Sequence, residues 1–299
     1  MKLPRILYED LVRKALLEDL GRVGDLTSDS IIPLGARARG NLITREAGCV
    51  AGLLVSTLAF PIMDPEVRIE YHVQDGDRVS AGQALATVEG EARSLLSAER
   101  SALNFLALLS GIATATRGIV DRLKDYPTKI VCTRKTTPGL RTLEKYAVRA
   151  GGGFNHRFGL DDAVLIKDNH LAVAGSIEEA VRRVRYYVAH TVKVEIEVET
   201  LEQLEIALRQ PIDAVLLDNM SIEQVKQAVR MVDGRLVTEV SGGITPETAV
   251  AYGAAGVDLI SVGWVTHSAP ALDVSLDVVS LTGLESAASA EREEVQALP

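Results

Sequence analysis

The sequence predicts an α/β protein whose larger part is an incomplete or modified α/β barrel. After Pro127, strand-like runs and helix-like segments alternate regularly, which is typical of a parallel sheet with helical connections. The six strand-like runs are residues 129–133, 163–167, 192–198, 213–218, 235–240 and 257–262. The helix-like segments between them are residues 141–150, 176–189, 199–210, 221–231 and 246–255. Six strands are too few for a complete barrel of this type.

The chain before Pro127 has a different pattern. Apolar and charged residues at helical spacing predict an amphipathic helix over residues 6–20, ended by Gly21. Short strands are predicted at residues 36–44, 67–73 and 84–88, with a turn-rich segment at 75–82 that suits a hairpin. A long helix follows over residues 92–124, with Gly111 as a candidate break and Pro127 as its stop. On this helix Arg100 shares a face with Asn104, and composition alone favours a solvated arginine there.

The C-terminal part is expected to return to the first domain. Residues 272–281 alternate in polarity like a strand, and residues 285–299 are rich in Ala, Ser and Glu, which favours a helix or a loose tail. We therefore divide the chain into a first domain, residues 1–112 joined by residues 270–299, and a barrel domain, residues 113–269.

Charge and composition narrow the ligand class. The formal net charge is −9, yet between Lys129 and Lys167 eight basic residues face three acidic ones. A basic island in an acidic protein indicates a small anionic ligand, and an aromatic content of 4% argues against base stacking on nucleic acid. Cys49 and Cys132 are too few for a disulfide framework or a metal cluster. The longest apolar run, residues 51–63, is too short to span a bilayer, and we expect a soluble cytoplasmic protein.

A charged residue or a glycine-containing loop stands at the carboxyl end of each of the six barrel strands, where barrel enzymes carry their functional groups. These residues are Thr133, Arg134, Lys135, Lys167, Glu197, Asp218, Ser241, Gly242, Gly243, Gly263 and Trp264. Each alone could be a solvated strand edge. Together they favour an anion or phosphate site.

Two loops near the end of the barrel, residues 241–246 and 261–264, favour phosphate binding. Gly242 and Gly243 lead into a helix whose expected cap is Thr245, with Pro246 at its first position. Glycines let the backbone approach a phosphate, and the free N–H groups at the helix start supply donors. The alternative is that these glycines serve tight turns alone.

Acidic residues suggest a divalent cation at the same edge. In the run VEIEVE at residues 194–199 all three glutamates lie on one side of a strand, and Asp218 ends the next strand. An exposed strand would give the same alternation. Two inward carboxylates, Glu197 and Asp218, would suit Mg²⁺ shared with substrate phosphates, or would stabilise positive charge on a sugar.

Several motifs together resemble one family. The main ones are TRKTTPG at residues 133–139, GGGFNHR at 151–157 and LIKDNH at 165–170. Supporting matches lie at residues 18–28, 98–100, 194–199, 217–219, 239–244 and 260–263. Over residues 8–281 the chain resembles quinolinate phosphoribosyltransferase, also called carboxylating nicotinate-nucleotide diphosphorylase.

The resemblance implies a fold and an activity. The fold is an N-terminal α/β sandwich joined to an incomplete, open TIM-like barrel, in a homodimer whose sites lie between subunits. The activity converts quinolinate and phosphoribosyl diphosphate into nicotinate mononucleotide, CO₂ and diphosphate with Mg²⁺, in NAD biosynthesis. The rivals are a phosphoribosyltransferase acting on another pyridine carboxylate and a silent anion-binding barrel. The number of cations favours a dicarboxylate over the first, and the pair Glu197 and Asp218 argues against the second.

The resemblance also implies residue roles. Quinolinate would be held by Thr133, Arg134, Lys135, His156, Arg157 and Lys167, with Arg100 entering from the partner subunit. Phosphoribosyl diphosphate would be held by Glu197, Asp218, Ser241, Gly242, Gly243, Val262, Gly263 and Trp264. The implied catalytic residues are Lys135, Lys167, Glu197 and Asp218, and the last two would hold Mg²⁺, directly or through water. Relatives often carry Asn at position 243, but backbone donation survives its replacement by Gly.

Overall fold

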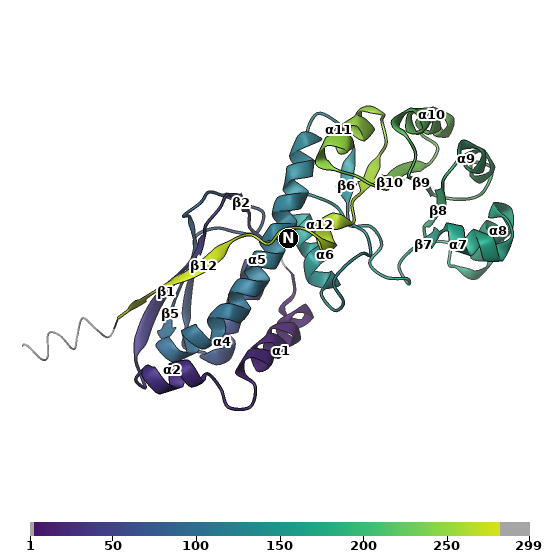
Figure 1. The fold of residues 1–299 in the computed structure, drawn as a ribbon. Helices are drawn as coiled ribbons and strands as arrows, with labels where there is room; N and C mark the ends of the chain where they lie inside the picture. The colour runs from purple at the N-terminus through teal and green to yellow at the C-terminus, as the bar shows by residue number, and fades with distance from the viewer. Residues whose placement is uncertain (1–2, 282–299) are drawn as a thin grey trace, which may run out of the picture. The chain divides into compact units, whose positions relative to one another are not determined.

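The structure, a computed structural model, describes residues 3–281 and divides the chain into two compact units (Figure 1). The first unit runs from the N-terminus to Thr114 and resumes at Pro270, and the second is Ala115–Ala269. The boundary falls within one long helix, α5 (Ala92–Arg122). The expected tail at residues 285–299 lies outside the described residues.

The first unit is built on an antiparallel sheet. Its order is β12 (Val274–Ser280), β1 (Arg37–Thr44), β5 (Ala84–Glu91) and β3 (Arg68–Tyr71). The pairing of β12 with β1 confirms that the C-terminal strand returns to the first unit. β3 and β5 pair as the expected hairpin. Their connection also contains β4 (Arg78–Val79), which pairs with β2 (Gly48–Cys49).

Helices cover one face of this sheet (Figure 1). They are η1 (Arg5–Leu7), α1 (Glu9–Leu20), α2 (Leu26–Ile31), α3 (Leu53–Thr57), α4 (Ala59–Met63) and the first part of α5. In β1 the side chains alternate between buried and more exposed positions, as a sheet with one covered face requires. The first unit is therefore a two-layer α/β sandwich.

Helix α5 runs without a break, so the expected division at Gly111 is wrong. A Cβ at Gly111 would come within 2.1 Å of the carbonyl oxygen of Pro270, so the glycine serves a close backbone contact. By length and apolar composition α5 could cross a membrane, although core helices of soluble proteins pass the same test. Leu95, Leu106 and Leu109 are fully buried within the protein, which makes α5 a core helix.

The second unit is a parallel sheet that does not close. Its order is β6 (Lys129–Val131), β11 (Leu259–Ser261), β10 (Val237–Ser241), β9 (Ala214–Asp218), β8 (Val194–Val198) and β7 (Val164–Ile166). All adjacent pairs are parallel. Within residues 3–281, β6 and β7 are the two ends of this order, which confirms an incomplete barrel.

Helices connect these strands on the outside. The five expected helices are α6 (Arg141–Ala150), α8 (Ile177–Tyr187), α9 (Leu201–Ala207), α10 (Ile222–Val232) and α11 (Pro246–Ala254). Thr245 caps α11 as predicted, accepting the N–H of Thr248, with Pro246 at the first helical position. In this unit the sequence did not predict the short helices α7 (Asp168–Ala174) and α12 (Trp264–His267). Both directly follow strand ends that carry site residues.

Strand β8 settles which way the glutamates face. Val194, Ile196 and Val198 are completely buried, and Glu195 and Glu197 on the opposite side are only 9% and 8% exposed. The alternative of an exposed strand is therefore wrong. Glu199 lies beyond the end of β8 and is exposed.

Candidate active site

A cavity of about 360 Å³ lies at the carboxyl ends of the second unit's strands. Parallel strands bring their carboxyl ends to one edge, so residues far apart in sequence meet there. The lining residues are Thr133, Arg134, Lys135, His156, Arg157, Leu165, Lys167, Glu197, Leu216, Asp218, Glu239, Ser241 and Ser261. The cavity thus gathers nine of the residues singled out from the sequence. Sequence reasoning gave no role to Glu239 or Ser261.

The connection between α6 and β7 carries His156 and Arg157 to the cavity. Phe154 pairs with the free edge of β6: its N–H donates to the carbonyl of Ile130, at 2.7 Å, and its carbonyl accepts the N–H of Cys132, at 3.1 Å. This short strand-like contact fixes the backbone two residues before His156. The edge of β6 that the open barrel leaves unpaired by another strand therefore positions His156 and Arg157.

Two arginines form the most cationic part of the wall. The buried Nε of Arg134 has no hydrogen-bond partner among the described residues. Arg157 donates from Nη1 to the carbonyl of Ala163 at 2.9 Å. Burial and, next, the nearby charge of Arg134 lower the pKa of the Arg157 guanidinium. An anion bound beside both guanidinium groups would offset their repulsion, and their planar donors suit a carboxylate.

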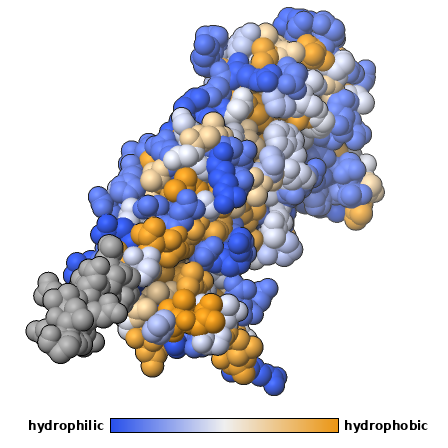
Figure 2. All heavy atoms as spheres, turned by 60° about the vertical axis from the view of Figure 1, so that its left-hand side comes forward, coloured by the Kyte–Doolittle hydropathy of each residue, from blue (hydrophilic) through white to orange (hydrophobic). Residues whose placement is uncertain are grey.

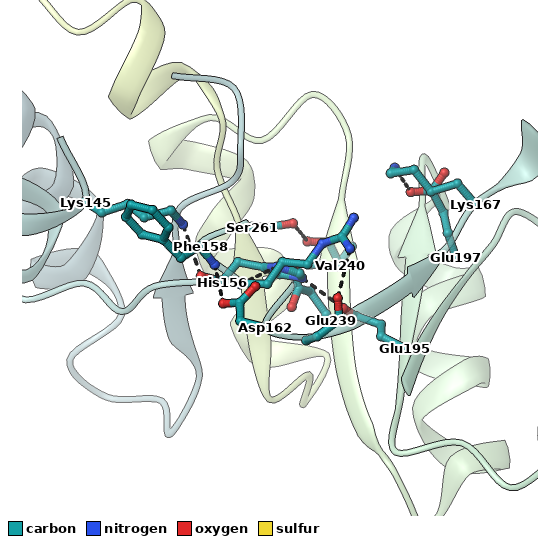
Figure 3. A network of polar contacts seen from close by, with 12 residues as sticks. Lys145, His156, Phe158, Asp162, Lys167, Glu195, Glu197, Glu239, Val240 and Ser261 are labelled. Atoms are coloured by element: carbon teal, nitrogen blue, oxygen red, sulfur yellow. Dashed lines mark hydrogen bonds and ion pairs between the residues drawn. The ribbon is translucent and has the colours of Figure 1, made fainter. Parts of the chain in front are cut away.

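Lys167 and Glu197, on neighbouring segments of the cavity wall, form an ion pair (Figure 3). Lys167 comes directly after β7 and starts α7, while Glu197 projects inward from β8. Asp218, at the end of neighbouring β9, accepts a hydrogen bond from Asn219 Nδ2 at 2.7 Å. Both carboxylates are oxygen donors of the kind that Mg²⁺ prefers, so the residues present fit that ion.

His156 sits between two buried glutamates (Figure 3). Its Nδ1 accepts the backbone N–H of Arg157 at 2.7 Å, so this nitrogen carries no proton. The ring proton is then on Nε2, which donates to Glu195 at 2.8 Å. The second carboxylate, Glu239, has Oε1 3.8 Å from Nε2. Both ring nitrogens of His156 are therefore engaged within the protein, which leaves its implied contact with quinolinate without a free donor in this arrangement.

The protonation of this cluster follows from burial and charge. Burial lowers the pKa of His156. The hydrogen bond to Glu195 and the charges of Glu239 and Glu195 raise it by more, so the pKa of His156 lies above its usual value. Burial, followed by the charge of Glu195, raises the pKa of Glu239 to about 7, against the opposing effects of His156 and the Ser261 hydroxyl. His156, Glu195 and Glu239 lie close enough to hold a metal ion. Since Nε2 carries the proton, we interpret them as a hydrogen-bonded network.

Lys145 supports the network from α6. This buried lysine donates to the carbonyl of His156 and to Cys132 Sγ, both at 3.0 Å. Cys132, like Cys49, is a buried cysteine.

The glycine loop lies beside the cavity. Gly242 has a φ of +99°, and a Cβ there would come within 2.0 Å of Asn219 Oδ1, so only glycine fits. Gly243 also has a positive φ, but open space surrounds it. The indole N–H of Trp264 donates to the carbonyl of Ile244 at 3.0 Å, tying the segment that follows Val262 and Gly263 to this loop. The loop leads into the N-terminus of α11, where backbone N–H groups can receive a phosphate.

Arg100 is exposed on α5 in the first unit, whereas every residue that lines the cavity belongs to the second. The sequence signal for the missed Glu239 was a single acidic residue inside an otherwise buried strand, VTEVS. A charge at such a position has to be paired or neutralised.

An open parallel α/β barrel with a cationic wall, paired carboxylates and a glycine loop before a helix defines an enzyme class that handles phosphorylated, anionic substrates. The chain belongs to the quinolinate phosphoribosyl transferase family. The family's N-terminal domain matches residues 25–110, and its C-terminal domain matches residues 112–277.

Relatives of similar length support this assignment. The chain is 45% identical over 269 residues to a probable carboxylating nicotinate-nucleotide pyrophosphorylase of Bacillus subtilis, covering 90% of this chain and 92% of that protein. It is 45% identical over 277 residues to the Mycobacterium leprae enzyme of that name, covering 90% and 96%. The crystal structure of NadC from Streptococcus pyogenes superposes with a TM-score of 0.91 at 42% identity, over 94% of this chain and 99% of that one.

Proposed function

We propose that this protein transfers the phosphoribosyl group of phosphoribosyl diphosphate to quinolinate and decarboxylates the product. The products are nicotinate mononucleotide, CO₂ and diphosphate, in the de novo synthesis of NAD. Similarity along nearly the whole chain to enzymes named carboxylating nicotinate-nucleotide pyrophosphorylase supports this activity. The observation that carries it is the meeting of Arg134, Arg157 and Lys167 at one cavity with Ser241, the residue that leads into the glycine loop.

The cationic wall would bind the two carboxylates of quinolinate. Arg134 and Arg157 offer planar donors for bidentate carboxylate binding, and Lys135 and Lys167 add charge at the rim. Thr133 contributes by shape, since its hydroxyl accepts the N–H of Lys135 at 3.0 Å and fixes the turn after β6. Several cations sharing one small cavity are better neutralised by a dicarboxylate than by a single carboxylate.

The opposite side of the cavity would bind phosphoribosyl diphosphate. Ser241, Gly242, Gly243 and Gly263 would receive the 5-phosphate, with Val262 and Trp264 shaping the loop. Glu197 and Asp218 would hold Mg²⁺ together with the diphosphate, directly or through water. The bound ion would supply positive charge for the leaving diphosphate.

The chemistry needs positioning more than proton transfer. The quinolinate nitrogen attacks the ribose carbon as diphosphate leaves, through a transition state with positive charge on the ring. Carboxylates aimed at that charge, Glu197 and Asp218, would stabilise it, and the cationic wall would hold the nitrogen in line. The C2 carboxylate then leaves as CO₂, and its bonding electrons remain on C2 beside the positive nitrogen.

A homodimer with Arg100 entering the partner's site is part of this proposal. Arg100 is exposed. The first unit also exposes large apolar side chains on its helices and their connections; Ile6, Val23, Leu26, Ile31 and Leu34 are each more than two-thirds exposed. Figure 2 shows such apolar surface, in orange, gathered on the lower part of the molecule. A surface of this kind suits burial against a second copy.

Turnover by the purified protein tests the activity. With quinolinate, phosphoribosyl diphosphate and Mg²⁺ we expect nicotinate mononucleotide and one CO₂ for each diphosphate released. Turnover of nicotinate without turnover of quinolinate would contradict the proposal and favour a paralogous activity on another pyridine carboxylate. No diphosphate with either acceptor would favour a silent anion-binding barrel.

Mixing inactive variants tests the shared site. Arg100→Ala and Lys167→Ala proteins should each be inactive, and heterodimers formed from them should regain activity at the one site that keeps both residues. An Asn104→Ala protein, altered one turn along the same exposed face, is the matched control and should remain active alone. Confirmed heterodimers without activity would rule out an arginine contributed by the partner.

A further inference from the structure

Glu239 is the buried acid of the cavity and has no role in the steps above. Glu239 is 1% exposed and lines the cavity from β10. Its Oε1 has no hydrogen-bond partner among the described residues. The Ser261 hydroxyl favours the ionised form of Glu239, but burial outweighs it, because a buried carboxylate with one oxygen unpaired is costly and a buried neutral carboxylic acid is much less so. An acid in this state could act as a proton donor.

A count of protons around Glu239 favours its neutral form. The Nε2–H of His156 is directed to Glu195, at 2.8 Å, while Glu239 Oε1 is 3.8 Å away. The ammonium group of Lys145 is directed to Cys132 and to the carbonyl of His156. Two buried carboxyl groups thus face one shared N–H, from β8 and β10. Burial and the charge of Glu195 raise the pKa of Glu239 to about 7, as this geometry requires.

The proposed reaction needs one proton at C2 of the pyridine ring. When the C–C bond to the C2 carboxylate breaks, CO₂ leaves and the electron pair stays on C2. Until C2 gains a proton, CO₂ still held beside the carbanion can add back, so net decarboxylation depends on proton delivery. The product carries hydrogen at C2, and that hydrogen comes from the enzyme or from water.

Glu239 is the best proton donor among the titratable residues that line the cavity, because the Nε2–H of His156 is directed to Glu195. Guanidinium groups do not release protons in proteins, and ammonium groups are weaker acids than carboxylic acids. Glu197 accepts from Lys167, and Asp218 accepts from Asn219, so these two act as acceptors. A donor works best when its pKa is near the working pH.

We propose that Glu239 is the catalytic acid that protonates C2 as CO₂ leaves, an inference that rests on the proposed function. The Glu239 O–H bond breaks, its proton forms the new C2–H bond, and its electron pair remains on the carboxylate. Movement of the His156 Nε2 proton toward Glu239 stabilises that carboxylate. Water reprotonates Glu239 before the next turnover.

The test separates the two products in a single turnover. Diphosphate reports phosphoribosyl transfer, and CO₂ reports decarboxylation. In the Glu239→Gln protein we expect CO₂ formation to fall by about 100-fold or more, with diphosphate release falling far less. The quinolinate mononucleotide, which keeps both carboxylates, should then accumulate and be detected by mass spectrometry.

The pH dependence gives a readout that a structural role would not move. In the wild-type protein, CO₂ formation should fall as the pH rises above about 7, because Glu239 loses its proton. Glu239→Gln should lack this decline, and Glu239→Asp should keep it at a reduced rate. Glu195→Gln keeps an acceptor for His156 but removes the neighbouring charge, so the decline should move to lower pH.

Each outcome decides something. A wild-type protein that releases no diphosphate with quinolinate would refute the proposed function, and this inference with it. If the wild-type protein is active but Glu239→Gln loses CO₂ and diphosphate formation equally, Glu239 has a structural or binding role and the inference is wrong. It is also wrong if Glu239→Gln forms CO₂ at the wild-type rate. Should neither Glu239 variant fold, a wild-type CO₂ rate that does not decline above about pH 7 would overturn it.

Discussion

Replacing Glu239 by Gln should make the protein's stability less sensitive to pH. Burial and the charge of Glu195 raise the pKa of Glu239 to about 7 in the folded protein, from 4.5 for the free side chain. The folded state therefore holds a proton between these two values that the unfolded state has lost, and stability falls as pH rises through that window. The rise corresponds to about 3 kcal/mol, because a tenfold change in a proton equilibrium is about 1.4 kcal/mol.

Gln has nearly the same shape and cannot ionise, so the variant escapes this loss. At pH 5 the group is mostly protonated in the folded protein, and at pH 8 it is ionised. Between these pH values, the free energy of unfolding of the variant relative to wild type should increase by about 2 to 3 kcal/mol. Urea denaturation of the ligand-free proteins at pH 5, 6.5 and 8 measures this difference, in which the titrations common to both proteins cancel. A difference that does not change with pH would show that Glu239 is not the buried acid described above.

Three further results are expected. Gly242→Ala should raise the KM for phosphoribosyl diphosphate about tenfold or more, because its Cβ would collide with Asn219. The control Gly175→Ala has a similar φ of +98° but no atom within 4 Å of its Cβ, so it should lose stability without a change in KM. Equal KM values for the two variants would contradict the role of the loop. Asp213→Asn should lower stability by about 1 kcal/mol near neutral pH, a value discounted for solvent exposure. Burial opposes ionisation of Asp213, but hydrogen bonds from Lys193, the Val194 N–H and Arg185 lower its pKa to about 2, so the cost should vanish in urea titrations as pH falls from 3.8 through about 2. Removal of divalent cations with EDTA should abolish turnover, and added Mg²⁺ should restore it. The Asp218→Asn protein should need a higher Mg²⁺ concentration for the same turnover. Turnover in the presence of EDTA would exclude the proposed metal role.

The order of strands and helices in the second unit could be predicted from the sequence, because it depends on local periodicity. Runs such as VEIEV place valine and isoleucine on one side of a strand whatever else the chain does. The cap of α11 could also be predicted, since Thr245, Pro246 and Thr248 interact within one turn of chain. The short helices α7 and α12 could not, because seven and four residues are too few to show a helical period.

Strand-end reasoning also located most of the candidate site. Once a parallel barrel is predicted, Arg134, Lys167 and Asp218 must approach the same edge, although no short-range signal connects them. The sequence did not indicate how Gly111 is used, because the atom that excludes a side chain there belongs to Pro270, far along the chain.

What the sequence determined by itself was thus the fold class, the family resemblance and which strand ends carry charge. Only the tertiary structure decided how the charges are paired. His156, Glu195 and Glu239 come from three separate segments, and their protonation depends on distances of 2.8 and 3.8 Å that exist only after folding. Because an interaction between buried charges changes steeply over such distances, a residue type in a pattern could not reveal that the pKa of Glu239 is raised.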